Sequence, residues 1–422
     1  MNPLAVRSWA FASLALASLL AAAPAGHDLN ALRPYIGGHQ AANLATLPSL
    51  QIPPPMPKSW PPDDQQHFIP ASFLADPLVQ DALAYVQAVV PASILNIPVS
   101  TYVSGPTVKY LSDPVANCYW PANQCVRTTA TANYKPDVFQ CPQQSTWGIS
   151  FDDGPTNDTV NHYDSIAIRA QLDKMKIKAT FFIVGTNLIE SPNIVLDEYN
   201  DGHQIGVHTW THHPLTSCTN EQIVAEIKYT EALIYKTIGQ VPNFFRPPYG
   251  DIDDRVRSIL GALGYTITIW DKDDFAADQA TTSTAIAQGL INNVTSQWLL
   301  PNQPGFVSLS HDITPFTSEV VLGYLKYIDA NRASIPLTIE PVGTCVNQPW
   351  YRSNSTSATS SASSSAAGAS ATGASGAAST AASTAPAGSL SASGAASTRA
   401  MSASTIATAL ATAAFALIAV LA

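Results

Sequence analysis

The sequence has little charge and no excess of basic residues. Only 12% of its 422 residues are charged, and 20 Lys and Arg against 30 Asp and Glu give a formal net charge of −10. A nucleic-acid-binding protein would normally present a basic face, so we expect no nucleic-acid partner, and no protein partner is implied. Acidic residues are also missing from both ends, since all of them lie between Asp28 and Glu340. The globular part is therefore shorter than the chain.

The first residues lack acidic side chains and have the order of an export signal. One basic residue, Arg7, precedes an apolar run at residues 9–23, and Ala23-Pro24-Ala25 provides an A-x-A cleavage pattern. A membrane anchor is the alternative, but the run is too short to span a bilayer comfortably. We predict a signal peptide at residues 1–25.

The C-terminal segment lacks the large apolar residues that a core requires. Between residues 361 and 390 almost every residue is Ser, Ala, Gly or Thr, and such a segment cannot offset its ordering entropy. We predict a stalk at 346–394 and a GPI-attachment propeptide at 395–422, because small residues at Ser393 and Gly394 precede a polar spacer and an apolar tail. A single-pass helix is the alternative. The ends together predict a secreted protein, GPI-anchored at the plasma membrane and cell wall.

Cysteine is scarce, with five residues in the chain, and none has zinc-ribbon spacing. Disulfides are the better interpretation in an exported protein. Cys118 and Cys125 could close a short loop, while Cys141 and Cys345 could join the ends of the segment that holds the motifs below. Cys218 is then unpaired. Sequons for N-glycosylation, which also suit export, begin at Asn157, Asn293 and Asn354.

Two regions lie between the ends. Residues 26–140 are rich in proline, with one predicted helix at 76–90, and we interpret them as a wrapping arm. Residues 141–345 alternate short apolar runs with helical patterns, one of which begins at a Thr219–Gln222 capping box and ends at Gly239. This alternation predicts a parallel sheet with covered faces, and about seven strands favour an α/β barrel over a doubly wound open sheet. The strands are predicted at 147–151, 179–184, 204–207, 243–245, 266–270, 306–309 and 336–339.

Unusual polar residues follow five of these predicted strands. In a parallel α/β barrel, the carboxyl ends of the strands carry the chemistry. One such run alone would be a polar turn, but five together predict an active site. The runs are Ser150–Pro155, His208–His213, Arg246–Gly250, Trp270–Asp274 and Ser308–Asp312.

The first two of these runs predict a metal site. Asp152 and Asp153 are adjacent carboxylates, which repel each other and become protonated on burial unless a cation is near. His208 and His212 are four positions apart, so on a helical turn they would face the same way. Two imidazoles and one carboxylate bind a divalent metal and leave positions open for water or substrate. His213 is the competing second histidine.

The later runs supply what a hydrolase needs beside a metal. A metal with an open position lowers the pKa of water and polarises a carbonyl. A carboxylate outside the metal site can accept a proton, and a histidine with a carboxylate partner, such as His311 with Asp273, can donate one. A buried Arg246 needs a carboxylate partner. These parts predict hydrolysis of an amide or an ester.

The runs resemble the motifs of the polysaccharide deacetylase family, also known as the NodB homology domain or carbohydrate esterase family 4. The fourth run departs from the family's D-x-x-D-W pattern, because it lacks the second spaced Asp and the Trp. The resemblance extends from about Cys141 to Cys345, roughly half of the chain. The matching patterns are T-F-D-D-G-P at Ser150–Pro155 (with Ser for Thr), H-[ST]-x-x-H at His208–His212, R-P-P-[YF]-G at Arg246–Gly250 and L-x-H-D at Leu309–Asp312.

The resemblance implies a distorted (β/α) barrel of the NodB type, with one divalent metal, most often zinc, for which cobalt can substitute. It implies that Asp153, His208 and His212 hold the metal and that Asp152, oriented by Arg246, is the general base. The other implied roles are an oxyanion contact from the Tyr249 backbone amide, an acetyl-pocket wall at Leu309, and a general acid at His311 partnered by Asp273 or, alternatively, Asp274.

The resemblance also implies a substrate. Family members act on N-acetylglucosamine polymers or on acetylated xylan, and an exported, GPI-anchored member with a stalk is similar to the fungal chitin deacetylases. We therefore expect hydrolysis of the N-acetyl groups of chitin to give chitosan and acetate. An acetyl-xylan esterase with the same site is one alternative. A wall-binding protein that has lost catalysis is another, although no predicted ligand or base is missing.

Overall fold

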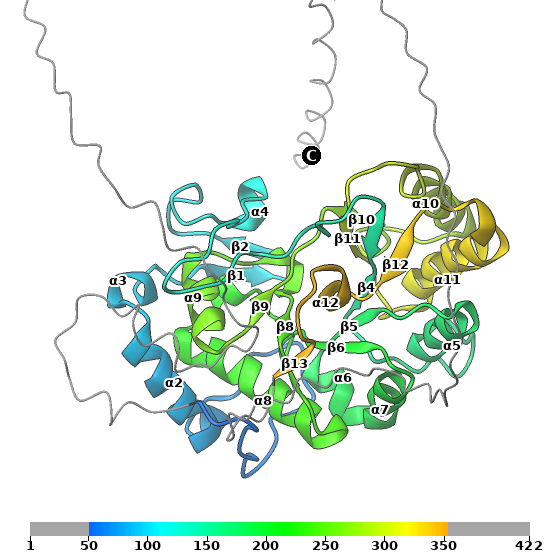
Figure 1. Cartoon of the computed structure of the whole chain (residues 1–422). Helices are drawn as coiled ribbons and strands as arrows, with labels where there is room; N and C mark the ends of the chain where they lie inside the picture. Colours follow the sequence, from blue (N-terminus) through cyan, green and yellow to red (C-terminus); the bar gives the residue numbers. More distant parts are fainter. Residues whose placement is uncertain (1–49, 353–422) are drawn as a thin grey trace, which may run out of the picture. The chain divides into compact units, whose positions relative to one another are not determined.

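The computed structural model describes residues 50–352. Figure 1 shows strands at the centre of this part and helices around them. The predicted signal peptide, the Asn354 sequon, the stalk beyond residue 352 and the GPI signal with Ser393 and Gly394 lie outside the described residues. Among residues 50–352, no helix is long and apolar enough to cross a membrane.

Parallel strands form two sheets, β4-β5-β6-β8-β9 and β10-β11-β3-β12. The sheets are connected twice, since only Ile149 separates β3 from β4, and residues 266–273 pair with β8 at one end and with β11 at the other. The pairing therefore leads around a ring, and the predicted α/β fold is confirmed. The strands are β3 Thr146–Gly148, β4 Ser150–Asp152, β5 Thr180–Ile183, β6 Gln204–Val207, β8 Phe244–Phe245, β9 Thr266–Ile267, β10 Lys272–Asp273, β11 Phe306–Leu309 and β12 Thr338–Glu340.

Helices follow the strands and cover the outside of this ring (Figure 1). The longest, α8, begins at the capping box in which Thr219 and Gln222 exchange hydrogen bonds, and ends at Gly239 in the left-handed conformation, as the sequence predicts. Strands β5 and β6 are buried along their whole length, because helices on one side and the ring interior on the other exclude water. The main helices are α5 Ser165–Met175, α6 Gly185–Glu190, α7 Pro192–Asn200, α8 Asn220–Ile238, α9 Asp254–Ala262, α10 Thr284–Gln297 and α11 Pro315–Ala330.

Two predicted strands differ most from the structure, one because it is divided and the other because it is much shorter. The strand predicted at 147–151 changes its neighbour at Ile149, whose N–H bonds to Glu340 of β12 and whose carbonyl accepts from Thr180 of β5. The strand predicted at 266–270 ends early because the chain turns from β8 towards β11 beyond Thr268. An apolar run shows that a strand is buried, but it does not show where the strand changes partners.

Residues 50–140 of the arm are part of the same core, and residues 26–49 lie outside the described residues. The arm's helix α2 begins after Asp76, whose carboxylate accepts from the N–H of Leu78, close to the predicted start. The buried face of α2 packs against α8 and belongs to the main hydrophobic cluster. The arm's elements are α1 Ala71–Leu74, α2 Pro77–Val89, α3 Ala92–Leu95, the hairpin of β1 Thr101–Ser104 and β2 Thr107–Lys109, and α4 Trp120–Asn123.

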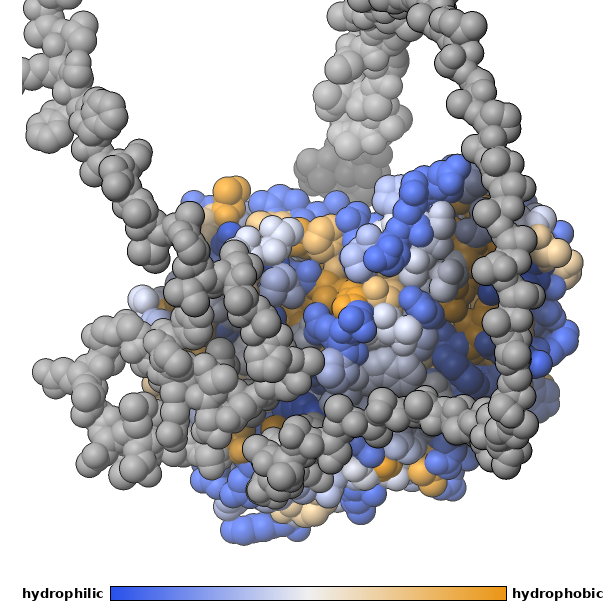
Figure 2. Space-filling model, viewed as in Figure 1, coloured by the Kyte–Doolittle hydropathy of each residue, from blue (hydrophilic) through white to orange (hydrophobic). Residues whose placement is uncertain are grey.

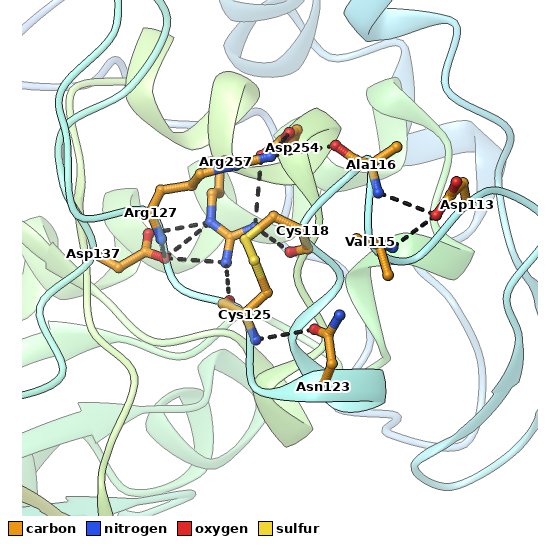
Figure 3. The surroundings of a disulfide bond; sticks show 10 residues. All are labelled: Asp113, Val115, Ala116, Cys118, Asn123, Cys125, Arg127, Asp137, Asp254 and Arg257. Carbon is orange, nitrogen blue, oxygen red and sulfur yellow. Dashed lines mark hydrogen bonds and ion pairs between the residues drawn. A yellow bond between two sulfur atoms is a disulfide. The ribbon is translucent and has the colours of Figure 1, made fainter.

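Two disulfides join the predicted cysteine pairs. Cys118 bonds to Cys125, Cys141 bonds to Cys345, and Cys218 is buried and free. Figure 3 shows the guanidinium of Arg257, on α9, beside the first disulfide. It donates hydrogen bonds to the carbonyls of Cys118 and Cys125 and to the carboxylate of Asp137. This fully buried arginine ties the C-terminal part of the arm to the ring of helices.

Remaining short elements complete the described part: β7 Val241–Pro242 pairs with β13 Tyr351–Arg352, and α12 Val342–Cys345 precedes the latter. The face drawn in Figure 2 is mostly hydrophilic, with apolar residues gathered in patches near its centre. Asn157 and Asn293, which begin the two sequons within the described residues, are both exposed.

Candidate active site

The Asp152–Asp153 pair lies at the end of β4, and a hydrogen bond from the next residue, Gly154, to Asp312 fixes its turn. Asp152 is the last residue of the strand, and Asp153 has a φ of 79°, a conformation that costs a non-glycine residue energy. The N–H of Gly154 donates to Oδ1 of Asp312 at 3.1 Å. A Cβ on Gly154 would lie 2.3 Å from that carboxylate, so only glycine fits here. Asp312 thereby fixes the turn that presents Asp153.

The His208–His212 segment is a loop rather than the helical turn on which the two histidines would face the same way. Thr209 and His212 have φ values of 69° and 61°, which interrupt any helix. The N–H of His212 donates to Oγ1 of Thr209 at 3.1 Å. Two histidines four apart can face each other on a folded loop as well as on a helix, so their spacing alone does not define the conformation.

A buried carboxylate on α8 shapes this loop. Oε2 of Glu226 accepts from the backbone N–H groups of Trp210 and Thr211, both at 2.8 Å, and Oε1 accepts from the Thr211 hydroxyl at 2.6 Å. Burial raises the pKa of Glu226, against the lowering effect of these hydrogen bonds. Three donors of the loop, which no helix or strand satisfies, are therefore paired with a single side chain.

Three side chains converge at the predicted metal site. Oδ1 of Asp153 lies 3.2 Å from Nε2 of His208 and 3.0 Å from Nε2 of His212, and the two nitrogens are 3.2 Å apart. Ligands about 2.0–2.1 Å from a tetrahedral zinc lie about 3.3 Å from one another, so the spacing suits such an ion. Among residues 50–352 this is the one group of His, Cys, Asp and Glu so arranged.

The hydrogen bonds around these side chains leave lone pairs available to bind a metal. Nδ1 of His208 lies 2.7 Å from the carbonyl oxygen of Arg246, which only accepts, so Nδ1 carries the proton and the Nε2 lone pair is free. Nδ1 of His212 contacts the Tyr249 hydroxyl at 3.1 Å. Oδ1 of Asp153 is buried without a hydrogen-bond partner. A divalent cation fits this donor set.

Electrostatics keep Asp153 ionised. Burial by itself would raise the pKa of its carboxyl group, but His212, His208 and His311 more than offset that effect and hold the pKa well below its ordinary value. The carboxylate therefore remains available as a ligand across the neutral and mildly acidic range.

Asp152 is held apart from the metal group by an arginine. Its Oδ1 accepts from Nη1 of Arg246 at 2.8 Å, and its Oδ2 lies 3.8 Å from Nε2 of His208. Both members of the ion pair are buried, at 2% and 0% exposed. Arg246 also lies over the rings of Phe182 and Trp270. The carboxylate partner that we predicted for a buried Arg246 is thus Asp152.

His311 lies beside Asp152 across neighbouring strands, since the two residues form a parallel β-bridge. Burial lowers the pKa of His311, but the carboxylates of Asp153, Asp152, Asp274 and Asp273 together raise it above its ordinary value. Asp274 is fully buried, and burial raises the pKa of Asp273 to about 6. No hydrogen bond joins His311 to either aspartate in the described structure, so both act on it through their charge.

The other predicted residues lie around this centre. Tyr249 has a φ of 59° and its partly exposed ring packs edge-on against His212 at 4.6 Å between centroids. Leu309 is buried at the end of β11, in register with Asp273. His213 does not join the metal group: its Nδ1 contacts the Thr211 hydroxyl, and its ring stacks on Phe68.

Comparison with known proteins agrees with this geometry. The polysaccharide deacetylase family matches residues 139–268. The chain carries a polysaccharide deacetylase domain. Chitin deacetylase 1 of Cryptococcus neoformans var. grubii is 31% identical over 334 residues, which are 76% of this chain and 63% of that protein. The chitin deacetylase of Amylomyces rouxii is 35% identical over 240 residues, 56% of this chain and 53% of that protein.

A solved structure is also similar to the polysaccharide deacetylase domain. The chitin deacetylase of Colletotrichum lindemuthianum is 24% identical, with a TM-score of 0.45, and the similarity covers 52% of this chain and 96% of that one. The chain spans less than two thirds of the length of the two curated relatives above. The similarity to the Cryptococcus protein extends to both sides of the domain match, because 76% of this chain is longer than either residues 1–268 or residues 139–422.

Sequence reasoning missed the residues that hold the ligand loops of the deacetylase domain. Asn187, on α6, donates from Nδ2 to the carbonyl of Asp153 at 2.7 Å. Glu226 could have been found, because it lies three positions after Ile223 on the apolar face of a predicted helix, where a charge needs a partner. Asn187 gave no such signal, since an amide near a helix start is common.

Replacement of Glu226 tests its effect on the histidine loop. Glu226→Leu is expected to lower the free energy of unfolding by about 1–3 kcal/mol for each donor left unpaired, and to weaken zinc binding. Glu226→Gln keeps an acceptor for the two N–H groups and should retain most of both properties. Urea unfolding and zinc titration of the apo-protein measure them. Equal effects of the two variants would contradict a hydrogen-bonding role.

Proposed function

We propose that this protein is a metal-dependent chitin deacetylase that hydrolyses the N-acetyl groups of N-acetylglucosamine polymers to give chitosan and acetate. The observation that carries the proposal is the separation of two adjacent carboxylates. Asp153 faces two imidazoles, whereas Asp152 faces Arg246 and remains outside the metal group. The names of the relatives from Cryptococcus and Amylomyces support chitin as the substrate.

We assign metal binding and proton acceptance to different residues of the site. Asp153, His208 and His212 would hold the ion, and zinc is our first choice, with cobalt as a substitute. When bound, the ion supplies a Lewis acid that polarises an acyl carbonyl and acidifies water. Because the geometry keeps Asp152 beside this site and paired with Arg246, its carboxylate is placed to accept a proton as the general base.

The acid and the oxyanion contact lie close by. His311 lies next to Asp152 on the neighbouring strand, and four carboxylates raise its pKa above the ordinary value, so it is placed to donate a proton to the departing amine. The backbone N–H of Tyr249 is proposed to contact the developing oxyanion, and the Leu309 side chain to border the acetyl methyl group. Asp273 and Asp274 then keep His311 protonated.

We also propose that the protein is exported, glycosylated at its exposed sequons Asn157 and Asn293, and GPI-anchored at the plasma membrane and cell wall. The exposure of both asparagines and the presence of two disulfides support export. Release of the protein from intact cells by a phosphatidylinositol-specific phospholipase is the expected result. Protein that stays membrane-bound after this treatment would contradict the anchor.

Acetate release tests the function. We expect the purified protein to release acetate from N-acetylglucosamine oligomers, to lose this activity after treatment with a chelator, and to regain it when zinc is added. Acetylated xylan is the comparison substrate. Release from xylan alone would identify an acetyl-xylan esterase, and release from neither, with intact zinc binding, would favour a wall-binding protein.

A further inference from the structure

A segment of the arm lies against both loops that carry the metal ligands. The ring of Trp60 stacks on Trp210, with centroids 6.0 Å apart and planes 6° from parallel. The indole N–H of Trp210 donates to the carbonyl of Pro62 at 2.9 Å. Phe68 stacks on His213 at 4.1 Å. These contacts lie on either side of His212 in sequence, so the segment at 60–68 is fixed on the histidine loop.

Between these contacts, Gln65 reaches the carboxylate loop. Its Nε2 donates to Oδ1 of Asn187 at 3.0 Å and to the hydroxyl of Thr186 at 2.8 Å. Asn187 in turn donates from Nδ2 to the carbonyl of Asp153 at 2.7 Å. An amide has its acceptor and its donors on different atoms, so a donor at Gln65 decides which way Asn187 faces.

We propose that Gln65 is a positioning residue for the metal ligand Asp153, acting through Asn187, and that the arm thereby sets the metal affinity of the site. The proposal rests on the metal site of the proposed function. It assigns a role to the arm that the deacetylase motifs do not contain, since Gln65 lies outside residues 139–268.

The Asp153 turn needs this support for a physical reason. Asp153 has a φ of 79°, which its own backbone does not favour, and its Oδ1 has no hydrogen-bond partner. Its orientation therefore depends on neighbours: Asn187 holds its carbonyl, and Asp312 holds the next N–H. If the side-chain amide of Asn187 rotated by 180°, its Oδ1 would face the carbonyl oxygen of Asp153. That carbonyl would then lose its hydrogen-bond donor.

Introducing a negative charge at Gln65 distinguishes positioning through Asn187 from a direct effect of charge on zinc affinity, because the two predict opposite changes. Gln65→Glu places an acceptor opposite Oδ1 of Asn187 and favours the inverted amide, so we expect the dissociation constant for zinc to rise by about tenfold. The added negative charge alone would act in the opposite direction and tighten cation binding. Gln65→Leu, which removes the donor without favouring inversion, should have a smaller effect of the same sign.

Gln66→Glu is the matched control, because it adds the same charge at the adjacent, exposed position, where no side-chain hydrogen bond is formed. Asn187→Leu gives the full effect of losing the donor to Asp153. Zinc affinity is measured on each apo-protein by competition with a chromophoric chelator, and thermal unfolding shows that all variants are folded. The measurement needs no substrate.

We expect Asn187→Leu to bind zinc most weakly, followed by Gln65→Glu and then Gln65→Leu. Gln66→Glu should bind zinc as tightly as the unaltered protein or more tightly. Gln65→Glu that binds zinc as tightly as Gln66→Glu, or more tightly, would overturn the inference and leave the proposed function intact. Failure of the unaltered protein to bind zinc would instead overturn the proposed function, and the inference with it.

Discussion

Asp152→Asn is expected to lower the rate of deacetylation by about 10²–10⁴-fold, the usual contribution of a general base, while zinc binding is retained. The amide has nearly the same shape as the carboxylate, and its oxygen can still accept from Nη1 of Arg246. It cannot accept a proton at neutral pH. The measurements are acetate release from chitin oligomers at saturating substrate and zinc content of the purified variant.

Asp153→Asn is the matched control for this variant. The same substitution one residue along the chain removes a charge from the metal group, so it should lower zinc affinity and activity together. Zinc added in excess should restore part of the activity of Asp153→Asn and none of that of Asp152→Asn. If Asp152→Asn deacetylated oligomers at the rate of the unaltered protein, another group would have to be the base.

Arg246→Leu is expected to lower the free energy of unfolding by about 3–5 kcal/mol, because it leaves the buried carboxylate of Asp152 without its partner. Arg246 is fully buried and Asp152 is 2% exposed, so water cannot replace the lost contact. The change is measured by urea unfolding of the apo-protein at pH 7, which excludes any contribution from bound metal.

The double variant Asp152→Asn/Arg246→Leu tests the reason for this loss. Once the carboxylate is neutral, no charge is left unpaired, so the double variant should be more stable than Arg246→Leu alone. Additive losses from the two substitutions would show that packing of Arg246 against Phe182 and Trp270, rather than its ion pair, accounts for the effect.

Much of the fold could be predicted because its signals are local. The bounds of β6 and β11, the capping box of α8 and its Gly239 end all depend on residues within one short stretch. Apolar periodicity reports burial, and cap residues satisfy the nearest free N–H groups. The change of strand partners at Ile149 is different, since it depends on where β12 returns along the chain.

The metal ligands were also open to prediction, whereas the shape of their loop was not. Asp153, His208 and His212 are recognisable by residue type at strand ends, and the barrel topology brings strand ends together. The His208–His212 segment is a loop whose Trp210 and Thr211 N–H groups pair with Glu226 on the following helix, and this partner cannot be read from the spacing of the two histidines.

By itself, then, the order of residues identified the groups to which we assign chemistry here: a carboxylate and two imidazoles for a metal, a second carboxylate for a proton, and a histidine for the leaving group. Only the tertiary structure decided how those groups are held. Gln65 lies 122 residues before Asn187, and nothing in the sequence distinguishes it from Gln66 beside it, which is exposed as Gln65 is. The reason is that hydrogen bonds between distant segments depend on the path of the whole chain, which local preferences do not specify.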